Sequence, residues 1–355
     1  MNIRYIYLSF LTLALALLVC ASCARADERQ KTHTDAVSDA QCAAPSALGH
    51  SPADTAILPA EDDSITLSFV GDCMLASEYY APGWNSFAEF ARSREPEYFF
   101  SRVSDMFLAD DFTIANCENV FTERALPPCE KDYTPAYWYK SDTVNAGIFA
   151  SGGVDIVSCA NNHTLDFGAD GMSDTAAALE NAGILWGDTS HPLMLEKNGT
   201  RIALYCTTIS NGGYIKHIAD WYDSVKDESE FQIVFFHGGI EMTYAPSAAI
   251  QTACRSIADM GVDVIIGHHP HVLQPMEHYN GAVIVYSLGN FLFGGGRPEN
   301  RTVIMQLSLY PDGESAVELL PAYCYGEDWQ PCLITDEGER AAVLDFMNGL
   351  REAPT

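Results

Sequence analysis

Residues 262–271 read Val-Asp-Val-Ile-Ile-Gly-His-His-Pro-His. The first five are almost continuously apolar, which is typical of a buried β-strand, and the alanine-rich stretch at about 247–260 is typical of a helix. Three of the last four residues are histidines, a pattern that neither a hydrophobic core nor a solvated surface explains well. Neutral imidazole is the commonest metal ligand in proteins. The stretch therefore predicts a helix and a strand of an α/β sheet, followed by a metal-binding loop.

The same alternation of helix and strand extends toward the N-terminus. Helical stretches are predicted at about 98–108, 142–150 and 169–182. Alternation of this kind is typical of α/β layers. The strands predicted between these helices and up to residue 236 are Ile65–Val70, Phe112–Ala115, Val154–Ser158, Ile184–Trp186, Arg201–Thr207 and Gln232–Phe236.

The C-terminal third contains two hairpins. Asn280-Gly281 and Asp312-Gly313 each lie between two apolar runs, and such dipeptides are strong signals for two-residue turns. Residues 336–351 are predicted to form a final helix. Hairpins added to an α/β alternation imply mixed sheets. We therefore predict the α/β class, as a sandwich of mixed β-sheets flanked by helices.

Polar residues follow five of the predicted strands. In α/β sheets, ligands bind beyond the carboxyl ends of strands, so this recurrence counts for more than any single cluster. Gly71-Asp72 alone is usually a turn, an Asn-rich segment can be a helix cap, and a lone strand-end histidine is often structural. Mixed N and O donors without a thiolate cluster suit Mn, Fe or Zn, as one or two ions. The clusters are Gly71-Asp72, Asn116-Cys117-Glu118, Asn161-Asn162-His163 with Asp166 and Gly168, His237 with Glu241, and Gly267–His271.

Together with Ser287-Leu-Gly-Asn-Phe291, these clusters form an ordered series of six motifs. The series resembles that of the CapA family, which are poly-γ-glutamate capsule biosynthesis proteins with a calcineurin-like metallophosphoesterase fold. The resemblance runs from about Ser64 to Leu320. It implies a metallophosphoesterase-like sandwich and a role in making, anchoring or processing an anionic cell-surface polymer.

The resemblance also implies roles for individual residues. Asp72 would bind one ion and His271 would complete its shell, with Glu118 in the bridging position. His163 would act from the outer shell, as an acid or as a clamp on the substrate. The second ion would be held by Asn162, His237 and His269, and the further candidate catalytic residues are Asp166 and Glu241.

Two positions depart from the general phosphoesterase pattern. Met74 stands where those enzymes have a histidine, and Glu118 stands where they have an aspartate. Methionine is a poor ligand for hard ions. The departure at Met74 predicts that one of the two metal sites is weak, which leaves open whether the protein is an enzyme.

The charge of the chain excludes one class of partner. Its 355 residues carry 48 acidic and 19 basic side chains, for a formal net charge of -29. Binding to nucleic acid needs clustered Lys and Arg, so no nucleic-acid partner is expected. The strong negative charge also argues against peripheral binding to anionic lipid. Its simplest effect is to keep the protein soluble.

The N-terminus is typical of an exported protein. Residues 1–26 combine Arg4 with an apolar run from Leu8 to Val19, which predicts a signal peptide. Cleavage after Ala26 and lipid attachment at Cys23 both remain open, and the second is favoured. Residues 27–63 have few large apolar side chains and predict a flexible tether. We therefore expect a protein tethered to the outer side of the cytoplasmic membrane, with a domain at 64–322 and a C-terminal extension at 323–355.

Two further sets of alternatives stay open. Cys117 with Cys129, and Cys324 with Cys332, are close enough in sequence to form disulfides in an oxidising compartment. The functional candidates are a metal-dependent hydrolase acting on an amide or phosphoester bond, a non-catalytic component of a capsule assembly or export complex, and a general exported metallophosphoesterase. The expected partners are an anionic polymer or the machinery that makes it.

Overall fold

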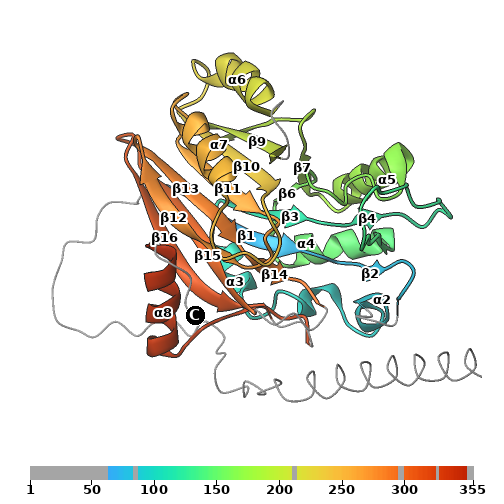
Figure 1. The fold of residues 1–355 in the computed structure, drawn as a ribbon. Coiled ribbons are helices and arrows are strands. Elements are labelled where there is room, and N and C mark those ends of the chain that lie inside the picture. The colour runs from blue at the N-terminus through green and yellow to red at the C-terminus, as the bar shows by residue number, and fades with distance from the viewer. Residues whose placement is uncertain (1–62, 83–86, 210–213, 295–299, 325–327, 350–355) are drawn as a thin grey trace, which may run out of the picture. The chain divides into compact units, whose positions relative to one another are not determined.

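Two β-sheets pack face to face in the computed structural model, and helices lie against their outer faces (Figure 1). The structure describes residues 63–82, 87–209, 214–294, 300–324 and 328–349. The predicted signal peptide at 1–26 and all of the predicted tether except Asp63 lie outside the described residues. Within the described part, no helix is long and apolar enough to cross a membrane.

The first sheet has the strand order β17-β16-β15-β1-β3-β6-β7, with β14 beside β1. Its centre is parallel, because β1, β3, β6 and β7 run in the same direction, whereas β15, β16 and β17 pair in antiparallel fashion. The strands are β1 Ile65–Cys73, β3 Phe112–Cys117, β6 Ile156–Ser158, β7 Leu185–Gly187, β14 Asn290–Leu292, β15 Arg301–Leu309, β16 Ser315–Tyr323 and β17 Cys332–Leu333.

The second sheet has the strand order β12-β13-β11-β10-β9-β8. Strands β9, β10, β11 and β13 are parallel, and β8 and β12 form antiparallel edges. The strands are β8 Leu193–Lys197, β9 Thr200–Ile209, β10 Phe231–Gly238, β11 Val264–His268, β12 Leu273–Tyr279 and β13 Ala282–Leu288. A small third sheet contains β2 Ser77–Glu78, β5 Tyr139–Ser141 and β4 Val120–Phe121.

Alternation along the strands creates three hydrophobic layers. Phe69 of β1 and Phe235 of β10 point into the core between the sheets, where their rings lie 6.1 Å apart. The next residue along β1, Val70, faces the helices of the first sheet, and Phe236 faces those of the second. The helices are α2 Phe87–Ala91, α3 Ser104–Phe107, α4 Gly147–Ser151 and α5 Gly168–Asn181 on the first sheet, α6 Tyr214–Val225 and α7 Ala248–Ala258 on the second, and α8 Glu337–Met347.

The predicted fold class is confirmed: the sheets are mixed, they form a sandwich, and helices flank it. Both hairpins are present, and Asn280 and Gly281 have the positive φ angles, 50° and 88°, of a two-residue turn. Helix α8 lies in the segment predicted as the final helix, and its Val343 and Met347 join the core between the sheets.

Two predictions of local structure were wrong or incomplete. The helix expected at about 98–108 is instead a 3-10 turn, Pro96–Tyr98, followed by the four-residue α3. Backbone bonds there switch between three- and four-residue spacing, as when Val103 and Ser104 both donate to the Phe100 carbonyl. The second difference is α6, a helix that the sequence pattern did not predict.

Neither suggested disulfide forms. Cys117 and Cys129 are both reduced, because Cys117 points from β3 into the apolar layer under the helices, whereas Cys129 is exposed in a loop. Cys332 is disulfide-bonded, but Cys324 takes no part in that bond. The Cys324 thiol instead donates a hydrogen bond to the carbonyl of Phe293.

Candidate metal centre

The carboxyl ends of strands from both sheets meet at one edge of the sandwich. Asp72 lies near the end of β1, and Glu118 directly follows β3 in the first sheet. In the second sheet His237 lies near the end of β10, and His269 and His271 follow β11. These five residues come from segments far apart in the sequence, yet their donor atoms form two overlapping groups. Five of the predicted residues thus lie together at this edge of the sandwich.

Glu118 belongs to both groups. One consists of Asp72, Glu118 and His237, and the other of Glu118, His269 and His271, with the donor atoms of each group within 4.8 Å of one another. The Glu118 Oε1 atom lies 3.7 Å from His237 Nε2 and 3.8 Å from His271 Nε2. Glu118 thus lies between two sets of donors, and its bridging role stays a prediction. In this grouping His237 lies with Asp72, and His271 with His269, so the division of ligands between two ions stays a prediction.

Two asparagines hold the cluster together from the side of the first sheet. The Asn116 Nδ2 atom donates to Asp72 Oδ1 at 2.7 Å and lies 3.2 Å from His237 Nδ1. Asn161 Nδ2 in turn donates to Asn116 Oδ1 at 3.2 Å and to the Cys117 carbonyl at 2.8 Å. The amide groups therefore orient one carboxylate and one imidazole, and such support around the ligands tunes a metal site.

The histidine loop adopts an unusual backbone. His269 has a φ angle of 97° and His271 one of 57°, both in the left-handed region that residues with a side chain rarely adopt. Each such residue costs on the order of 1–3 kcal/mol and persists only where its surroundings impose it. Here the His269 N–H donates to Asp72 Oδ2 at 3.2 Å, and His271 Nδ1 lies 2.9 Å from Asn290 Oδ1. The loop is thus held in a strained conformation that brings both imidazoles to Glu118.

Gly71 allows β1 to approach the neighbouring turn. A Cβ atom at this position would lie 2.1 Å from the carbonyl oxygen of Gly289. Because backbone atoms cannot move aside like the end of a side chain, only glycine fits there. The glycine thus lets Asp72 pair with Asn290 of β14, whose side chain is the partner of His271.

Burial and neighbouring charges set the protonation of the cluster. Burial alone would raise the pKa of Asp72, but hydrogen bonds and charge from His268 and His271 outweigh it, so its pKa lies well below the usual value. Burial lowers the pKa of His237 well below its usual value, and the nearby His269 adds to this effect. Burial and His271 together lower the pKa of His269. The cluster therefore offers an ionised carboxylate at Asp72 and neutral imidazoles at His237 and His269, the forms that bind metal.

These shifts predict how the stability of the metal-free protein depends on pH. In the unfolded chain the three histidines His163, His237 and His269 titrate near about 6.5, whereas their folded pKa values are lower. Below about 6.5 the unfolded chain binds more protons, so the free energy of unfolding falls as pH falls, until the folded pKa values are reached. Denaturant unfolding in a chelator at several pH values between about 7.5 and 5 would measure this. Constant stability across the range would contradict it.

His163 and Asp166 form a buried pair beside the cluster. His163 Nδ1 lies 2.8 Å from Asp166 Oδ2, an oxygen that also accepts the Tyr139 N–H. The Lys131 Nζ atom reaches Asp166 Oδ1 at 2.5 Å and donates to the Tyr137 carbonyl. Only 8% of the Lys131 side chain and none of the Asp166 side chain is exposed. The sequence pointed to the pair but not to Lys131, which lies in a loop without any regular pattern.

The remaining residues discussed in the sequence analysis, Asn162, Glu241 and Met74, lie outside both donor groups. Asn162 is exposed and lines a cavity beside His237. Its neighbour Asn161, which belongs to the same predicted motif but was not predicted as a ligand, joins the buried network. Glu241 is exposed and belongs to neither donor group, although its charge acts on the pKa of His269. Met74 lies in a small apolar cluster with Tyr139 and other residues.

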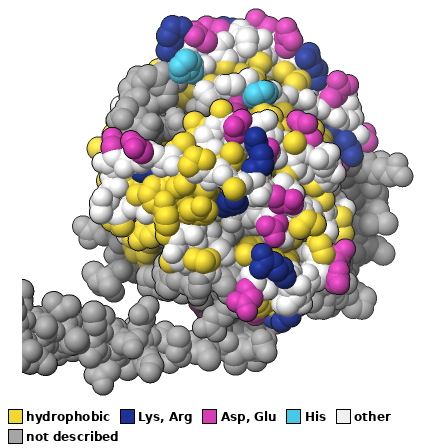
Figure 2. Space-filling model, turned by 90° about the vertical axis from the view of Figure 1, so that its right-hand side faces the viewer, with side chains coloured by type: hydrophobic (Ala, Val, Ile, Leu, Met, Phe, Trp, Pro, Cys, Tyr) yellow, Lys and Arg dark blue, Asp and Glu magenta, His cyan; other side chains and the backbone are white. Residues whose placement is uncertain are grey.

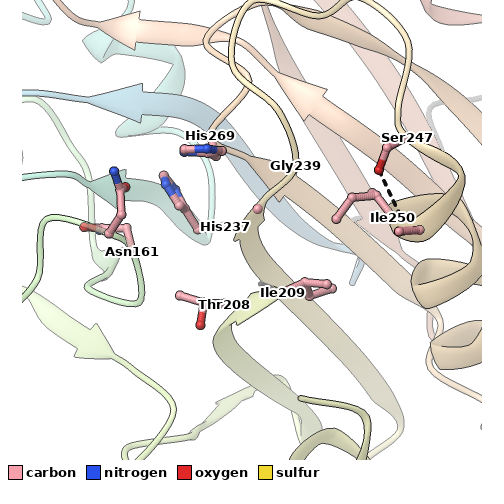
Figure 3. Close-up of a pocket in the computed structure, with 11 residues that line it drawn as sticks. Asn161, Thr208, Ile209, His237, Gly239, Ser247, Ile250 and His269 are labelled. Carbon is pink, nitrogen blue, oxygen red and sulfur yellow. Dashed lines mark hydrogen bonds between the residues drawn. The ribbon is translucent and has the colours of Figure 1, made fainter. Parts of the chain in front are cut away.

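A cavity of about 440 Å³ opens beside the cluster (Figure 3). His237 and His269 line one part of it, and Ser247 and Ile250, at the start of α7, line another. A molecule bound at the cluster can therefore extend into this space. The remaining lining residues are Asn161, Asn162, Thr208, Ile209, Gly238, Gly239 and Ala249.

An aromatic surface lies on the side of the molecule where α5 and β4 lie. Figure 2 shows hydrophobic side chains gathered on this side, with Lys and Arg side chains beside them. Tyr80, 66% exposed, packs edge-on against Trp138 at 5.5 Å, and Tyr133 is also exposed. The Lys131 Nζ atom lies 5.5 Å from the Trp138 ring, so this surface is joined to the His163–Asp166 pair.

The residues fit a transition-metal centre. His237 Nε2 and His269 Nδ1 are buried nitrogens that have no hydrogen-bond partner among the described residues. An unpaired buried nitrogen costs free energy unless something binds it. Two carboxylates and three imidazoles are a mixed N and O donor set, which suits Mn, Fe or Zn better than Ca or Mg.

Comparison with known proteins places the chain in a family. The family model described as bacterial capsule synthesis protein PGA_cap matches residues 66–295. PGA biosynthesis protein CapA of Bacillus subtilis (strain 168) is 29% identical over 286 residues, covering 73% of this chain and 72% of that protein. Capsule biosynthesis protein CapA of Bacillus anthracis is 27% identical over 288 residues, covering 74% of this chain and 68% of that protein.

Among solved structures, a hypothetical protein from Thermus thermophilus is similar with a TM-score of 0.46 and 15% sequence identity, covering 74% of this chain and all of that one. The family match spans β1 to β14 and thus every residue of the donor cluster. The chain belongs to the bacterial capsule synthesis protein family PGA_cap.

Proposed function

We propose that the protein is an exported, metal-dependent capsule protein that acts in the synthesis, anchoring or processing of an anionic cell-surface polymer such as poly-γ-glutamate. The observation that carries the proposal is the convergence of four donor residues from both sheets on a fifth, Glu118, in a chain of this family. Export and attachment to the outer side of the cytoplasmic membrane, through residues 1–26, are part of the proposal and rest on the sequence.

One or two divalent ions would be held by the five donor residues, Asp72, Glu118, His237, His269 and His271. Such an ion acts as a Lewis acid on a carbonyl or phosphoryl oxygen. His163 is held by Asp166 through Nδ1, so its Nε2 is the atom that can accept or give a proton. Burial lowers the pKa of His163 and so favours the neutral imidazole, and the charge of Lys131, which pairs with Asp166, adds to this effect. The residues therefore suit cleavage of an amide or phosphoester bond.

Elemental analysis by mass spectrometry, followed by hydrolysis assays, tests the proposal. We expect one or two equivalents of Mn, Fe or Zn and slow cleavage of γ-glutamyl amide bonds. Rapid turnover of bis-nitrophenyl phosphate would instead indicate a general exported metallophosphoesterase. Bound metal and affinity for poly-γ-glutamate without any cleavage would indicate a non-catalytic component of an assembly or export complex. Absence of metal after reconstitution would refute the proposed metal dependence.

A further inference from the structure

The cavity beside the donor cluster has an unusual lining for this protein. The chain has a formal net charge of -29, yet none of the residues that line the cavity is Asp, Glu, Lys or Arg. The lining offers hydrogen-bond donors instead, in the amide of Asn162 and the hydroxyls of Thr208 and Ser247. An anionic group entering this space would therefore meet hydrogen-bond donors, and no carboxylate among the lining residues.

The N-terminus of α7 forms one wall of the cavity. This helix of 11 residues begins at Ala248, and its N-cap Ser247 accepts the Ile250 N–H. The N–H groups of the first turn before Ile250 have no partner inside the helix, and the helix dipole adds partial positive charge there. Ser247, Ala249 and Ile250 all line the cavity, so this end of the helix faces it.

A second feature points to a ligand in the same space. His237, only 4% exposed, lines the cavity, and its Nε2 atom has no hydrogen-bond partner among the described residues. His269, which also lines the cavity, has a buried Nδ1 in the same situation. The cavity is therefore continuous with the metal centre, and one molecule can occupy both.

The backbone opposite α7 leaves room for such a group. Gly239 has a φ angle of 114°, and a Cβ atom there would have Pro270 at 3.6 Å as its nearest neighbour. Gly238, the residue before it, approaches the Ile209 carbonyl so closely that a Cβ atom would lie 2.4 Å from it. The Gly238–Gly239 turn thus gives the cavity a wall of bare backbone.

We propose that this cavity is an anion subsite, in which the first turn of α7 binds a carboxylate or phosphate of a molecule whose reacting bond lies at the metal centre. The proposal deepens the proposed function and rests on it, since the anion would belong to the same substrate. It assigns specificity to Ser247, Ala249 and the backbone of α7, residues outside the donor cluster.

Ala249→Glu tests the proposal without threatening the helix. A glutamate in the first turn of a helix is favourable for folding, because it faces the positive end of the dipole. At position 249 it also places a negative charge in the cavity. We expect the affinity of the metal-loaded full chain for N-acetylglutamate, measured by calorimetry, to fall at least about tenfold through charge repulsion.

Two matched variants isolate the charge. Ala249→Gln has the same size without the charge and should lose at most a few-fold in affinity. Ala248→Glu carries the same charge on the same turn, at an exposed residue that does not line the cavity, and should bind nearly as well as the unchanged protein. Equal losses in Ala249→Gln and Ala249→Glu, or no loss in either, would overturn the proposal.

Inorganic phosphate serves as the second probe. If Ala249→Glu weakens phosphate binding more than N-acetylglutamate binding, the subsite takes a phosphate, and the reverse order identifies a carboxylate. Failure of both probes to bind the metal-loaded protein would overturn the subsite. Metal content is measured on the same samples, so an absence of metal, which would refute the proposed function, is told apart from failure of the subsite.

Discussion

Replacing Lys131 by methionine is expected to lower the free energy of unfolding by about 3–5 kcal/mol, because it leaves the buried carboxylate of Asp166 without its cation. The Lys131 side chain is 8% exposed, that of Asp166 is fully buried, and their charged atoms lie 2.5 Å apart. Removing one member of such a pair is costly, since the remaining charge keeps its desolvation penalty and loses its partner. Denaturant unfolding of the Lys131→Met protein measures the loss.

A double variant separates lost charge from lost packing. Lys131→Met combined with Asp166→Asn removes both charges, and the amide oxygen can still accept the Tyr139 N–H. We expect the double variant to be more stable than Lys131→Met alone. The coupling free energy between the two changes should exceed about 1 kcal/mol. If the two losses simply add, Lys131 acts through packing against Trp138 and not through its charge.

Lys216→Met is the matched control. Lys216 also pairs with an aspartate, Asp220, but 77% and 62% of the two side chains are exposed. Water solvates both groups before and after the change, so we expect little effect on stability. A loss as large as that of Lys131→Met would mean that removing any lysine from this acidic chain is harmful, and the buried pair would not be special.

The sequence predicted the strands and the ligands at their ends because both depend on local patterns. The apolar run at 262–266 followed by three histidines defined β11 and its loop, and Asp72 and Glu118 follow runs of the same kind. Since parallel strands end at one edge of a sheet, local patterns were enough to bring these residues together. Figure 1 shows this convergence of β1, β3, β10 and β11.

Features that depend on tertiary packing could not be predicted from the sequence. Lys131 is buried only because its loop folds over the His163–Asp166 pair, and nothing in the residues around it forms a periodic pattern. The choice between Asn161 and Asn162 depends on which amide the turn after β6 points inward. The predicted disulfides were wrong for the same reason, because closeness in sequence does not determine on which face of a strand a thiol lies.

Replacing Glu118 by glutamine is expected to abolish metal binding at the centre, with a loss of affinity of at least about 100-fold. Outer-shell changes alone often cost about 10–100-fold, and Glu118 contributes a donor atom to both groups of ligands. Elemental analysis and the rise in melting temperature on adding Mn²⁺ or Zn²⁺ measure the effect, because a ligand that binds only the folded state stabilises it. The unchanged protein should show the rise, and the variant should show none.

The metal-free Glu118→Gln protein should nevertheless be at least as stable as the unchanged protein without metal. Donor oxygens of Asp72 and Glu118 lie within 4.8 Å of each other, and two buried carboxylates repel unless a cation lies between them. Glu241→Gln is the control, because Glu241 is exposed and outside both groups, so metal content should be retained. If Glu118→Gln destabilises the metal-free protein and still binds metal, Glu118 is a structural carboxylate, and the centre must be built on Asp72 and the histidines alone.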